Sequence, residues 1–323
     1  MNEARPRGAA RAGTDSFRNS LVEEAQRTIA AGSKSFRFAS QIFDLKTRER
    51  SWLLYAWCRA CDDITDGQTL GHDAVSVDNP AERIAFLRAQ TDLALAGQPT
   101  GLVPFDSLCM VADETRIPAH LPHDHLAGFT RDAAGWTPAS EDDLLSYCYQ
   151  VAGAVGVMMA HVMGVYPAER DTRAEDTFRR ASDLGIAFQL ANIARDIVDD
   201  AKVGRSYIPT EWDADLDPLD PAHRPRLVEV AKRLSHLADR YRASSKVGAA
   251  RLPFRSRWAV LSAAAIYGEV ATRAVKLGPH AWDQRISISK AEKFALVAKA
   301  FVEALLPVRK VSREGLWTKR EAV

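Results

Sequence analysis

One segment organises this chain: Gln189-Leu190-Ala191-Asn192-Ile193-Ala194-Arg195-Asp196-Ile197-Val198-Asp199-Asp200. Apolar residues recur every three or four positions between Phe178 and Val198, which predicts a helix. Four polar residues fall at spacings of 3, 4 and 4, so on a helix they share one face: Gln189, Asn192, Asp196 and Asp200. The sequence therefore predicts a stripe of two amides and two carboxylates along an otherwise apolar helix.

The carboxylates of this polar face need a positive charge beside them. Like charges at i and i+4 repel, and carboxylates among apolar residues are costly to bury unless a cation neutralises them. A solvated acidic surface would account for Asp196 and Asp200 alone. It would not account for Gln189 and Asn192 in register with them among Leu, Ile, Ala and Phe residues. The pattern favours a cation-binding face.

A second helix of the same kind is predicted from Thr47 to Asp66. It carries Asp62 and Asp66 at i and i+4, with Arg59 one turn before Asp62. Two such faces on either side of a cavity would offer four carboxylates. These suit Mg²⁺, because this ion prefers a few carboxylates together with water and substrate phosphate. A single Asp-x-x-x-Asp pair is common and is weak evidence for a metal site. Two such pairs, each with matched polar residues upstream, are strong evidence for one.

Composition excludes several classes of protein. The 323 residues are 46% hydrophobic, which is ample for a sizeable core. A net charge of +1 argues against a nucleic-acid partner. The chain has no signal peptide and no long uncharged apolar run, so we expect a cytoplasmic protein, at most peripheral at the inner membrane face. The pair Cys58 and Cys61 has no second cysteine pair to complete a zinc site.

Helical periodicity continues along the chain, without a convincing strand pattern or internal repeat. Helices are expected at roughly 17–32, 47–66, 81–95, 105–115, 120–134, 144–165, 178–198, 226–245, 256–276 and 289–308. Residues 1–15 have almost nothing to bury and are expected to be a disordered tail, and residues 312–323 a loose charged tail. We therefore expect an all-α protein, with a single domain over 16–311 that forms a helical bundle around a central cavity.

Glycines recur inside the apolar helix expected at 144–165, at Gly153, Gly156 and Gly164. Glycine in a helix costs up to about 1 kcal/mol relative to alanine, so its repetition indicates a spatial need. Two explanations remain open from the residues alone. Either another helix packs closely against this one, or a long ligand lies beside it.

Six segments together carry a resemblance to a known family: Gly32-Ser33-Lys34-Ser35-Phe36, residues 55–66, residues 147–156, residues 183–200, Gly204-Arg205-Ser206-Tyr207-Ile208-Pro209 and Ile266-Tyr267. In these motifs and their order the chain resembles the squalene and phytoene synthase family, most closely the bacterial phytoene synthases. The similarity runs from about Leu21 to Pro307, which is nearly the whole chain. This is far more specific than any single motif.

The resemblance implies the all-α isoprenoid synthase fold and a transferase of prenyl groups in carotenoid biosynthesis. Two geranylgeranyl diphosphates would join head to head through prephytoene diphosphate to give phytoene and release diphosphate. The implied cofactor is Mg²⁺, for which Mn²⁺ is expected to substitute, without NADPH. The implied partners are geranylgeranyl diphosphate, a membrane surface contacted peripherally for product release, and a downstream desaturase.

The resemblance also assigns roles to residues. The implied catalytic residues are Arg59, Tyr147 and Tyr267. The implied metal ligands are Asp62, Asp66, Asn192, Asp196 and Asp200. The residues implied to contact the substrate diphosphate are Ser33, Ser35, Arg59, Gln189, Lys202, Arg205 and Tyr207. The residues implied to line a prenyl tunnel are Phe36, Val151, Ala152, Val155, Gly156, Met159, Leu184 and Phe188. Asp132 matches a family aspartate to which we assign no role.

Three alternatives remain open. The chain would instead be a squalene or presqualene diphosphate synthase of hopanoid biosynthesis if it uses farnesyl diphosphate, since substrate length depends on which side chain closes the tunnel. The Asp-Asp-x-x-Asp pattern from Asp62 to Asp66 also fits head-to-tail prenyl synthases and terpene cyclases, although the context of Arg59 and Gln189 points away from them. A non-catalytic binding protein of this fold would typically have lost the motif aspartates, and all four are present.

Overall fold

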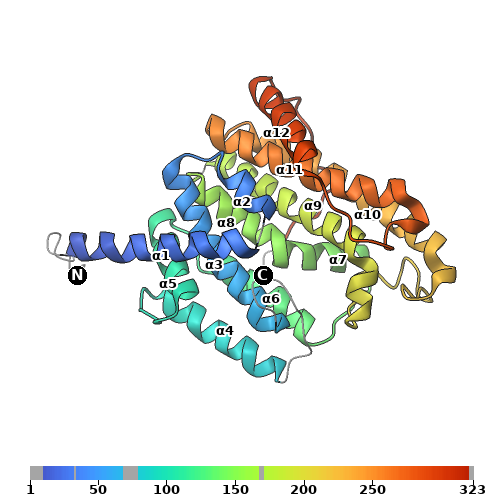
Figure 1. Ribbon diagram of the computed structural model, residues 1–323, viewed down its shortest axis with the longest axis horizontal. Helices are drawn as coiled ribbons and strands as arrows, with labels where there is room; N and C mark the ends of the chain where they lie inside the picture. The colour runs from blue at the N-terminus through green and yellow to red at the C-terminus, as the bar shows by residue number, and fades with distance from the viewer. Residues whose placement is uncertain (1–9, 33, 68–78, 167–170, 320–323) are drawn as a thin grey trace. The chain divides into compact units, whose positions relative to one another are not determined.

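In the computed structural model, the residues that the structure describes are 10–32, 34–67, 79–166 and 171–319. All regular elements in these ranges are helices, and no strand occurs among them (Figure 1). The all-α class predicted from the sequence is therefore confirmed. The helices group into two compact units, residues 1–117 and 118–323, and each is described by itself. None of the described helices combines the length and apolar character needed to cross a membrane.

The first unit contains five described helices: α1 (Ala10–Gly32), α2 (Lys34–Ser40), α3 (Leu45–Asp66), α4 (Pro80–Leu95) and α5 (Val103–Thr115). At its start, α3 is capped by Asp44, whose carboxylate accepts a hydrogen bond from the Thr47 backbone N–H at 3.0 Å. It ends at Gly67, whose φ of 60° is readily adopted only by glycine. Helix α3 packs against α1, α4 and α5, and its buried Trp57 fills the centre of this unit.

An ion-pair network ties three helices of the first unit together. Arg18 of α1 contacts Glu49 of α3 at 2.7 Å and also pairs with Glu114 of α5. Arg50 of α3 contacts Glu114 at 2.7 Å. Burial raises the pKa of Glu114, but the two arginines outweigh this effect and hold the pKa below its usual value. The network therefore stabilises the packing that positions α3.

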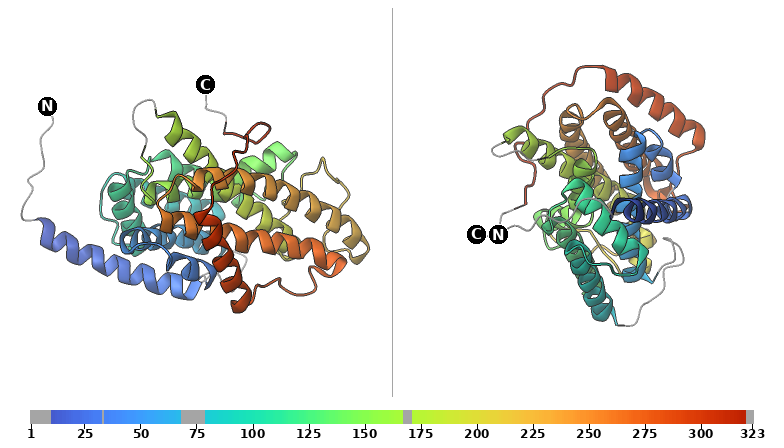
Figure 2. Two further views of the ribbon diagram at one scale, coloured as in Figure 1. Left: turned by 90° about the horizontal axis from the view of Figure 1, so that it is seen from above. Right: turned by 90° about the vertical axis from the view of Figure 1, so that its left-hand side faces the viewer.

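The second unit contains ten described elements: α6 (His120–Ala133), α7 (Glu141–Cys148), a π-helical turn η1 (Tyr149–Gly153), α8 (Ala154–Val162), α9 (Thr172–Lys202), the 3₁₀ turn η2 (Pro221–His223), α10 (Arg224–Ala249), α11 (Phe254–Leu277), the 3₁₀ turn η3 (Gly278–His280) and α12 (Lys290–Leu305). Helix α9 packs against α8, α10, α11 and η1. Figure 2 shows α10 and α11 as long neighbouring helices of this unit.

Helix α9 is held at its start and at its middle. The Asp171 carboxylate caps the helix by accepting hydrogen bonds from the backbone N–H groups of Arg173 and Ala174, at 2.9 and 3.1 Å. Further along, the buried indole N–H of Trp282 donates to the Ala194 carbonyl oxygen at 3.2 Å. Helix α9 is thus anchored within the segment that carries its polar face.

Glycines allow α8 and η1 to lie directly against α9. A Cβ on Gly185 of α9 would lie 2.1 Å from the Ala152 carbonyl oxygen, and a Cβ on Gly156 would lie 2.3 Å from the Ala181 carbonyl oxygen. A Cβ on Gly153 would lie 2.8 Å from the Ser182 hydroxyl. Close helix packing therefore accounts for Gly153 and Gly156, rather than the room for a ligand that the family resemblance favours at these positions.

Both chain ends are more ordered than the sequence predicts. Helix α1 begins at Ala10, inside the expected disordered tail of residues 1–15. At the other end, Arg313 makes a bidentate pair with the buried Asp183 carboxylate, at 2.8 Å for both bonds. The Trp317 backbone N–H donates to the Tyr241 hydroxyl at 3.0 Å. The expected loose tail over 312–323 is thus held against the second unit up to residue 319, because Arg313 neutralises a carboxylate that is fully buried.

Candidate functional site

The predicted polar face of the first unit is present on α3. Tyr55, Arg59, Asp62 and Asp66 are all partly exposed, whereas the adjacent Ala56, Trp57 and Cys61 are buried. Both carboxylates therefore reach a surface that core packing has left open.

Arg59 is the centre of this face. Its guanidinium lies 3.3 Å from Asp62 and 3.9 Å from Asp63, and its Nε donates to the Tyr55 hydroxyl at 3.4 Å. The Tyr55 ring in turn stacks on Phe36, with ring centroids 5.2 Å apart. Arg59 is thus held in an extended pose by groups on both sides, with a positive charge next to two carboxylates. A cation beside hard oxygen ligands suits an anionic ligand that arrives with a metal ion.

Two predicted residues next to this face are outside what can be described. Ser33 lies outside the described residues, and the side chain of Ser35 does as well. Their assignment to the substrate diphosphate therefore stays a prediction.

The polar face of the second unit runs along α9. Gln189, Asn192, Asp196 and Asp200 are partly exposed, while Leu190, Ala191, Ile193, Ala194, Ile197 and Val198 between them are buried. The spacing inferred from the sequence is therefore realised as a stripe of partly exposed polar side chains that alternates with buried apolar ones.

Arg195 is a member of this face that sequence reasoning missed. Its guanidinium makes a bidentate hydrogen bond with the Asp196 carboxylate, one bond of which is 2.7 Å long. Adjacent residues on a helix do not share a face, so helical spacing does not predict this pair. The pair partly neutralises Asp196, and Arg195 is available to an incoming anion if a metal takes over the carboxylate.

Asp200 has an unusual protonation equilibrium. Burial, followed by the charges of Asp196 and Asp132, raises its pKa to about 7, against a smaller opposing effect of Arg205 and Arg195. Three carboxylates therefore share one region of the second unit with less positive charge than they need. This is the electrostatic condition under which a divalent cation binds.

Asp132 of α6 is the second residue that sequence reasoning left without a role. It accepts hydrogen bonds from the Tyr147 hydroxyl at 2.9 Å and from the Tyr207 hydroxyl at 3.0 Å. The two rings stack with centroids 4.9 Å apart. Burial, followed by the Asp132 charge, raises the pKa of Tyr147 well above its usual value, so both phenols stay protonated and donate to the carboxylate. The only available signal in the sequence was the match to a family aspartate.

Tyr147 is thereby removed from direct contact with solvent. It is 3% exposed and lies between Trp136 and Tyr207. Its hydroxyl is engaged by Asp132, so we regard it as a residue that positions Asp132 and Tyr207. Tyr267 of α11 differs, because it is partly exposed and stacks on Phe188 of α9 with centroids 4.1 Å apart.

The segment after α9 folds back over the second unit. The Arg205 backbone N–H donates to the Asp200 carbonyl oxygen at 2.9 Å, and the Thr210 backbone N–H donates to the Pro138 carbonyl oxygen at 3.0 Å. Tyr207 is thus buried between two anchored points. Lys202, however, is exposed, and its charge is paired with Asp199 at 2.8 Å.

The predicted tunnel residues of the second unit share an intermediate burial. This holds for Val151, Ala152, Val155, Gly156, Met159, Leu184 and Phe188. Gly156 nevertheless faces the α9 backbone, as described above. The neighbouring Met158 is fully buried and belongs to the core.

The residues present fit a divalent metal by their chemistry. Carboxylate and amide oxygens are the ligands that Mg²⁺ prefers, and burial, followed by the neighbouring Asp196 charge, raises the pKa of Asp200. In the parts of the chain that the structure describes, no three His, Cys, Asp or Glu side chains are already gathered around one point. Asp196 is engaged by Arg195 instead, so metal binding would require this carboxylate to exchange partners.

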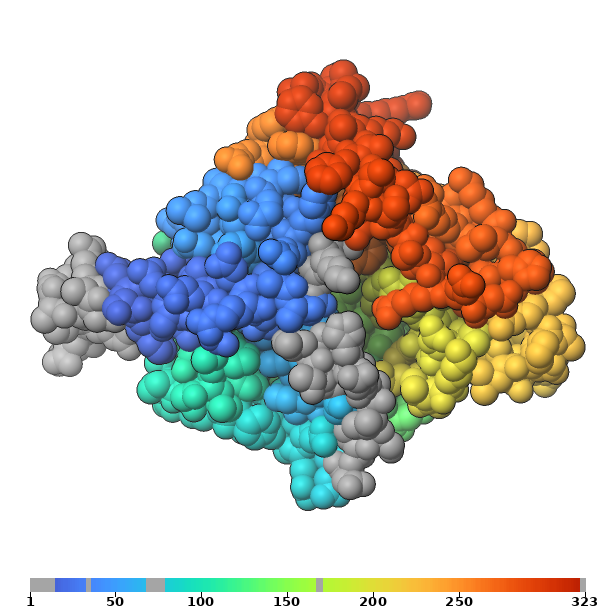
Figure 3. All heavy atoms as spheres, viewed as in Figure 1, coloured from blue at the N-terminus to red at the C-terminus, as the bar shows by residue number. Residues whose placement is uncertain are grey.

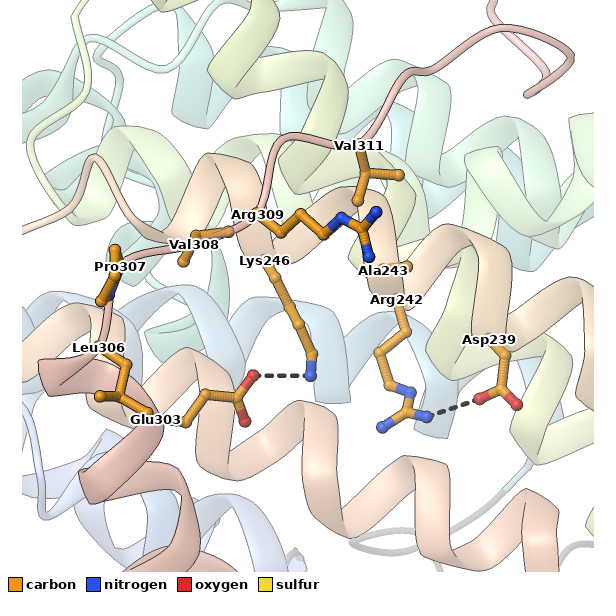
Figure 4. A pocket seen from close by; sticks show the side chains of 10 residues that line it. All are labelled: Asp239, Arg242, Ala243, Lys246, Glu303, Leu306, Pro307, Val308, Arg309 and Val311. Atoms are coloured by element: carbon orange, nitrogen blue, oxygen red, sulfur yellow. Dashed lines mark hydrogen bonds and ion pairs between the residues drawn. The ribbon is translucent and has the colours of Figure 1, made fainter.

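A separate pocket of about 320 Å³ lies between α10, α12 and residues 306–311 (Figure 4). Four of its charged groups form two ion pairs, in which Lys246 contacts Glu303 at 2.6 Å and Arg242 contacts Asp239 at 2.7 Å, and Arg309 is a fifth charged lining residue. It contains none of the polar residues of α9.

Comparisons with known proteins agree with these features. Residues 29–292 match the family model described as squalene/phytoene synthase. The chain is 42% identical over 304 residues to a 15-cis-phytoene synthase of Paracoccus sp. (strain N81106 / MBIC 01143), covering 93% of this chain and 98% of that protein. It is also 42% identical to a 15-cis-phytoene synthase of Pantoea ananas, covering 88% and 93% of the two chains.

Solved structures share the fold. A dehydrosqualene synthase in complex with ligand superposes with a TM-score of 0.77 at 25% identity, covering 89% of this chain and 98% of that chain. A squalene synthase from Alicyclobacillus acidocaldarius superposes with a TM-score of 0.69 at 19% identity, covering 81% and 95%. The family model matches most of the chain, and the relatives at 42% identity cover nearly its full length. The solved structures share the all-α isoprenoid synthase fold, in agreement with the acidic faces on α3 and α9. The chain therefore belongs to the squalene/phytoene synthase family.

Proposed function

We propose that this protein is a phytoene synthase, a prenyltransferase of carotenoid biosynthesis. It condenses two molecules of geranylgeranyl diphosphate head to head, through prephytoene diphosphate, to phytoene. The observation that carries this proposal is the 42% identity, over almost the full length of both chains, to relatives described as 15-cis-phytoene synthases. The acidic faces of α3 and α9 support it, because both keep every carboxylate of the two motifs.

The first chemical requirement is stabilisation of the leaving diphosphate. An allylic diphosphate ionises when positive charge neutralises the departing oxygens. We assign this role to Arg59 and Arg205, with hydrogen bonds from Gln189 and, by resemblance, from Ser33 and Ser35. Arg195 joins this group, because its guanidinium is beside the carboxylate face of α9. Lys202 is the weakest of the assignments, since its charge is paired with Asp199 on the exposed side.

Mg²⁺, for which Mn²⁺ can substitute, would supply the remaining positive charge when bound. We assign its ligands to Asp62 and Asp66 in the first unit and to Asn192, Asp196 and Asp200 in the second. The raised pKa of Asp200 supports this assignment, since a bound cation would hold that carboxyl in its charged form.

Asp132 and the two tyrosines maintain the arrangement of the second unit. Asp132 fixes the Tyr147 and Tyr207 hydroxyls, and Tyr207 belongs to the segment that carries Arg205. The contact between Asp132 and Tyr207 therefore fixes the path of the segment that carries Arg205 after the end of α9. Tyr147 acts through Asp132 and Tyr207 as a positioning residue.

The second requirement is a dry apolar space, because water would quench a carbocation. We assign it to partly buried apolar residues of η1, α8 and α9, among them Leu184 and Phe188. Tyr267 stacks on Phe188 and supplies an aromatic face next to the polar stripe, which suits a cationic intermediate.

The test is incubation of the purified protein with Mg²⁺ and a single prenyl diphosphate, without NADPH, followed by identification of the product. We expect phytoene from geranylgeranyl diphosphate, with a higher kcat/KM than for farnesyl diphosphate. A preference for farnesyl diphosphate would instead identify a squalene or presqualene diphosphate synthase. A product that forms only with NADPH would identify a squalene synthase.

A further inference from the structure

We propose that the outward face of α12 and the start of α11 form a docking surface for an anionic lipid bilayer. The buried residues of helix α12 are Val297, Ala300 and Ala304. Its large apolar residues point outward: Phe301, Val302 and Leu305 are 38%, 56% and 62% exposed. Figure 3 shows this helix, in red, on the surface of the second unit. A soluble helix normally has the opposite arrangement.

These residues form one continuous patch. Leu305 lies one helical turn from both Phe301 and Val302, so its side chain adjoins both of theirs, and Leu306 just beyond the helix is 55% exposed. The patch extends onto α11, because the Phe254 ring packs edge-on against Phe301 with centroids 5.6 Å apart. Phe254 is itself 41% exposed. A contiguous apolar surface of this kind marks a site of association rather than scattered exposure.

The patch is held rigid by Trp258. Its ring lies 5.0 Å from Phe301, and its indole N–H donates to the Val297 carbonyl oxygen of α12 at 2.9 Å. The aromatic part of the surface is therefore formed before any partner arrives. Preformed Trp and Phe side chains are typical of helices that lie in a membrane interface.

Basic residues flank the patch along the chain and select the type of partner. Residues 290–310 contain five cations (Lys290, Lys293, Lys299, Arg309 and Lys310) and two carboxylates. Glu303 pairs with Lys246 and Glu292 pairs with Arg273, so both carboxylates are neutralised by residues of other helices (Figure 4 for Glu303). Lys290, Lys299, Arg309 and Lys310 are exposed. The whole chain carries a net charge of only +1, so this is a local excess.

An apolar helix face with a basic border is complementary to an anionic bilayer, whose acyl chains take the apolar residues and whose headgroups take the cations. One further argument rests on the proposed function: phytoene is a hydrocarbon, and it dissolves in a bilayer. A second copy of the chain is less suited, because two faces with the same excess of positive charge would repel.

The test is co-flotation of the full-length protein with vesicles, in the absence of substrate, so that failure of binding is separate from failure of catalysis. Vesicles of phosphatidylcholine with phosphatidylglycerol should bind the protein, and raised salt should weaken binding. Leu305→Glu and Lys299→Glu should each weaken binding by about tenfold or more. Leu219→Glu is the matched control, since Leu219 is 52% exposed in a loop outside the patch, and it should bind as the unaltered protein does.

Two results would overturn the proposal. One is equal binding of Leu305→Glu and the unaltered protein to the anionic vesicles. The other is a light-scattering mass of two chains for the unaltered protein and of one chain for Leu305→Glu, because the patch would then be an interface between two copies. The variant replaces an exposed side chain, and a far-UV circular dichroism melt matching that of the unaltered protein shows that loss of binding is not loss of fold.

Discussion

Replacing Gly185 by alanine should destabilise the second unit, although alanine is the better helix former. The added Cβ would lie 2.1 Å from the Ala152 carbonyl oxygen, 2.5 Å from its carbonyl carbon and 2.8 Å from the Gly153 Cα. All three are backbone atoms, so no side-chain rotation can relieve the contact. A carbon–oxygen contact is normally about 3.3 Å or longer, so α9 must move about 1 Å away from η1.

The magnitude follows from two opposing effects. Overpacking of this kind costs about 1–3 kcal/mol or more, and the upper part of the range applies because the backbone must shift. Alanine recovers up to about 1 kcal/mol through helix propensity. We therefore expect a net loss of about 2 kcal/mol, which corresponds to a fall of about 3 °C in the apparent Tm of a chain this size.

A matched control is available in the same unit. Gly268 of α11 is also helical, but a Cβ there would meet only the end of the Arg242 side chain, at 3.0 Å. Because that side chain can move, Gly268→Ala should leave the Tm unchanged or raise it slightly. The assay is thermal denaturation followed by far-UV circular dichroism. A Gly185→Ala protein that melts at or above the temperature of the unaltered protein would refute the packing argument.

The other predictions concern the metal, the cofactor and the C-terminal segment. Asp62→Ala and Asp196→Ala should each abolish nearly all turnover with little effect on the Tm, and near-normal rates in Mg²⁺ would contradict the ligand assignment. EDTA should stop the reaction and Mg²⁺ should restore it, and adding NADPH should change neither the rate nor the product. Arg313→Ala should lower the stability by about 3–5 kcal/mol, since it leaves Asp183 buried without its cation. Arg240→Ala, which loses one exposed hydrogen bond to the C-terminal segment, should cost less than about 1 kcal/mol, and equal losses in the two variants would exclude this explanation.

The sequence alone determined the helices and their polar faces. Helical spacing is a local property, so the apolar period around Gln189 predicted both α9 and the shared face of Asp196 and Asp200. The same reasoning identified α3 with Arg59 and Asp62. The order of the motifs was enough to recognise the family.

Tertiary structure decided what depends on residues far apart in the chain. Spacing could not tell whether Gly156 makes room for a ligand or for a helix, because the answer depends on the Ala181 carbonyl oxygen of another helix. Asp132 had no assignable role until the fold brought Tyr207 to it. Arg313 looked like part of a loose tail, because no local pattern shows that a buried carboxylate 130 residues earlier requires its charge. Burial creates these requirements, and burial is known only once the chain has folded.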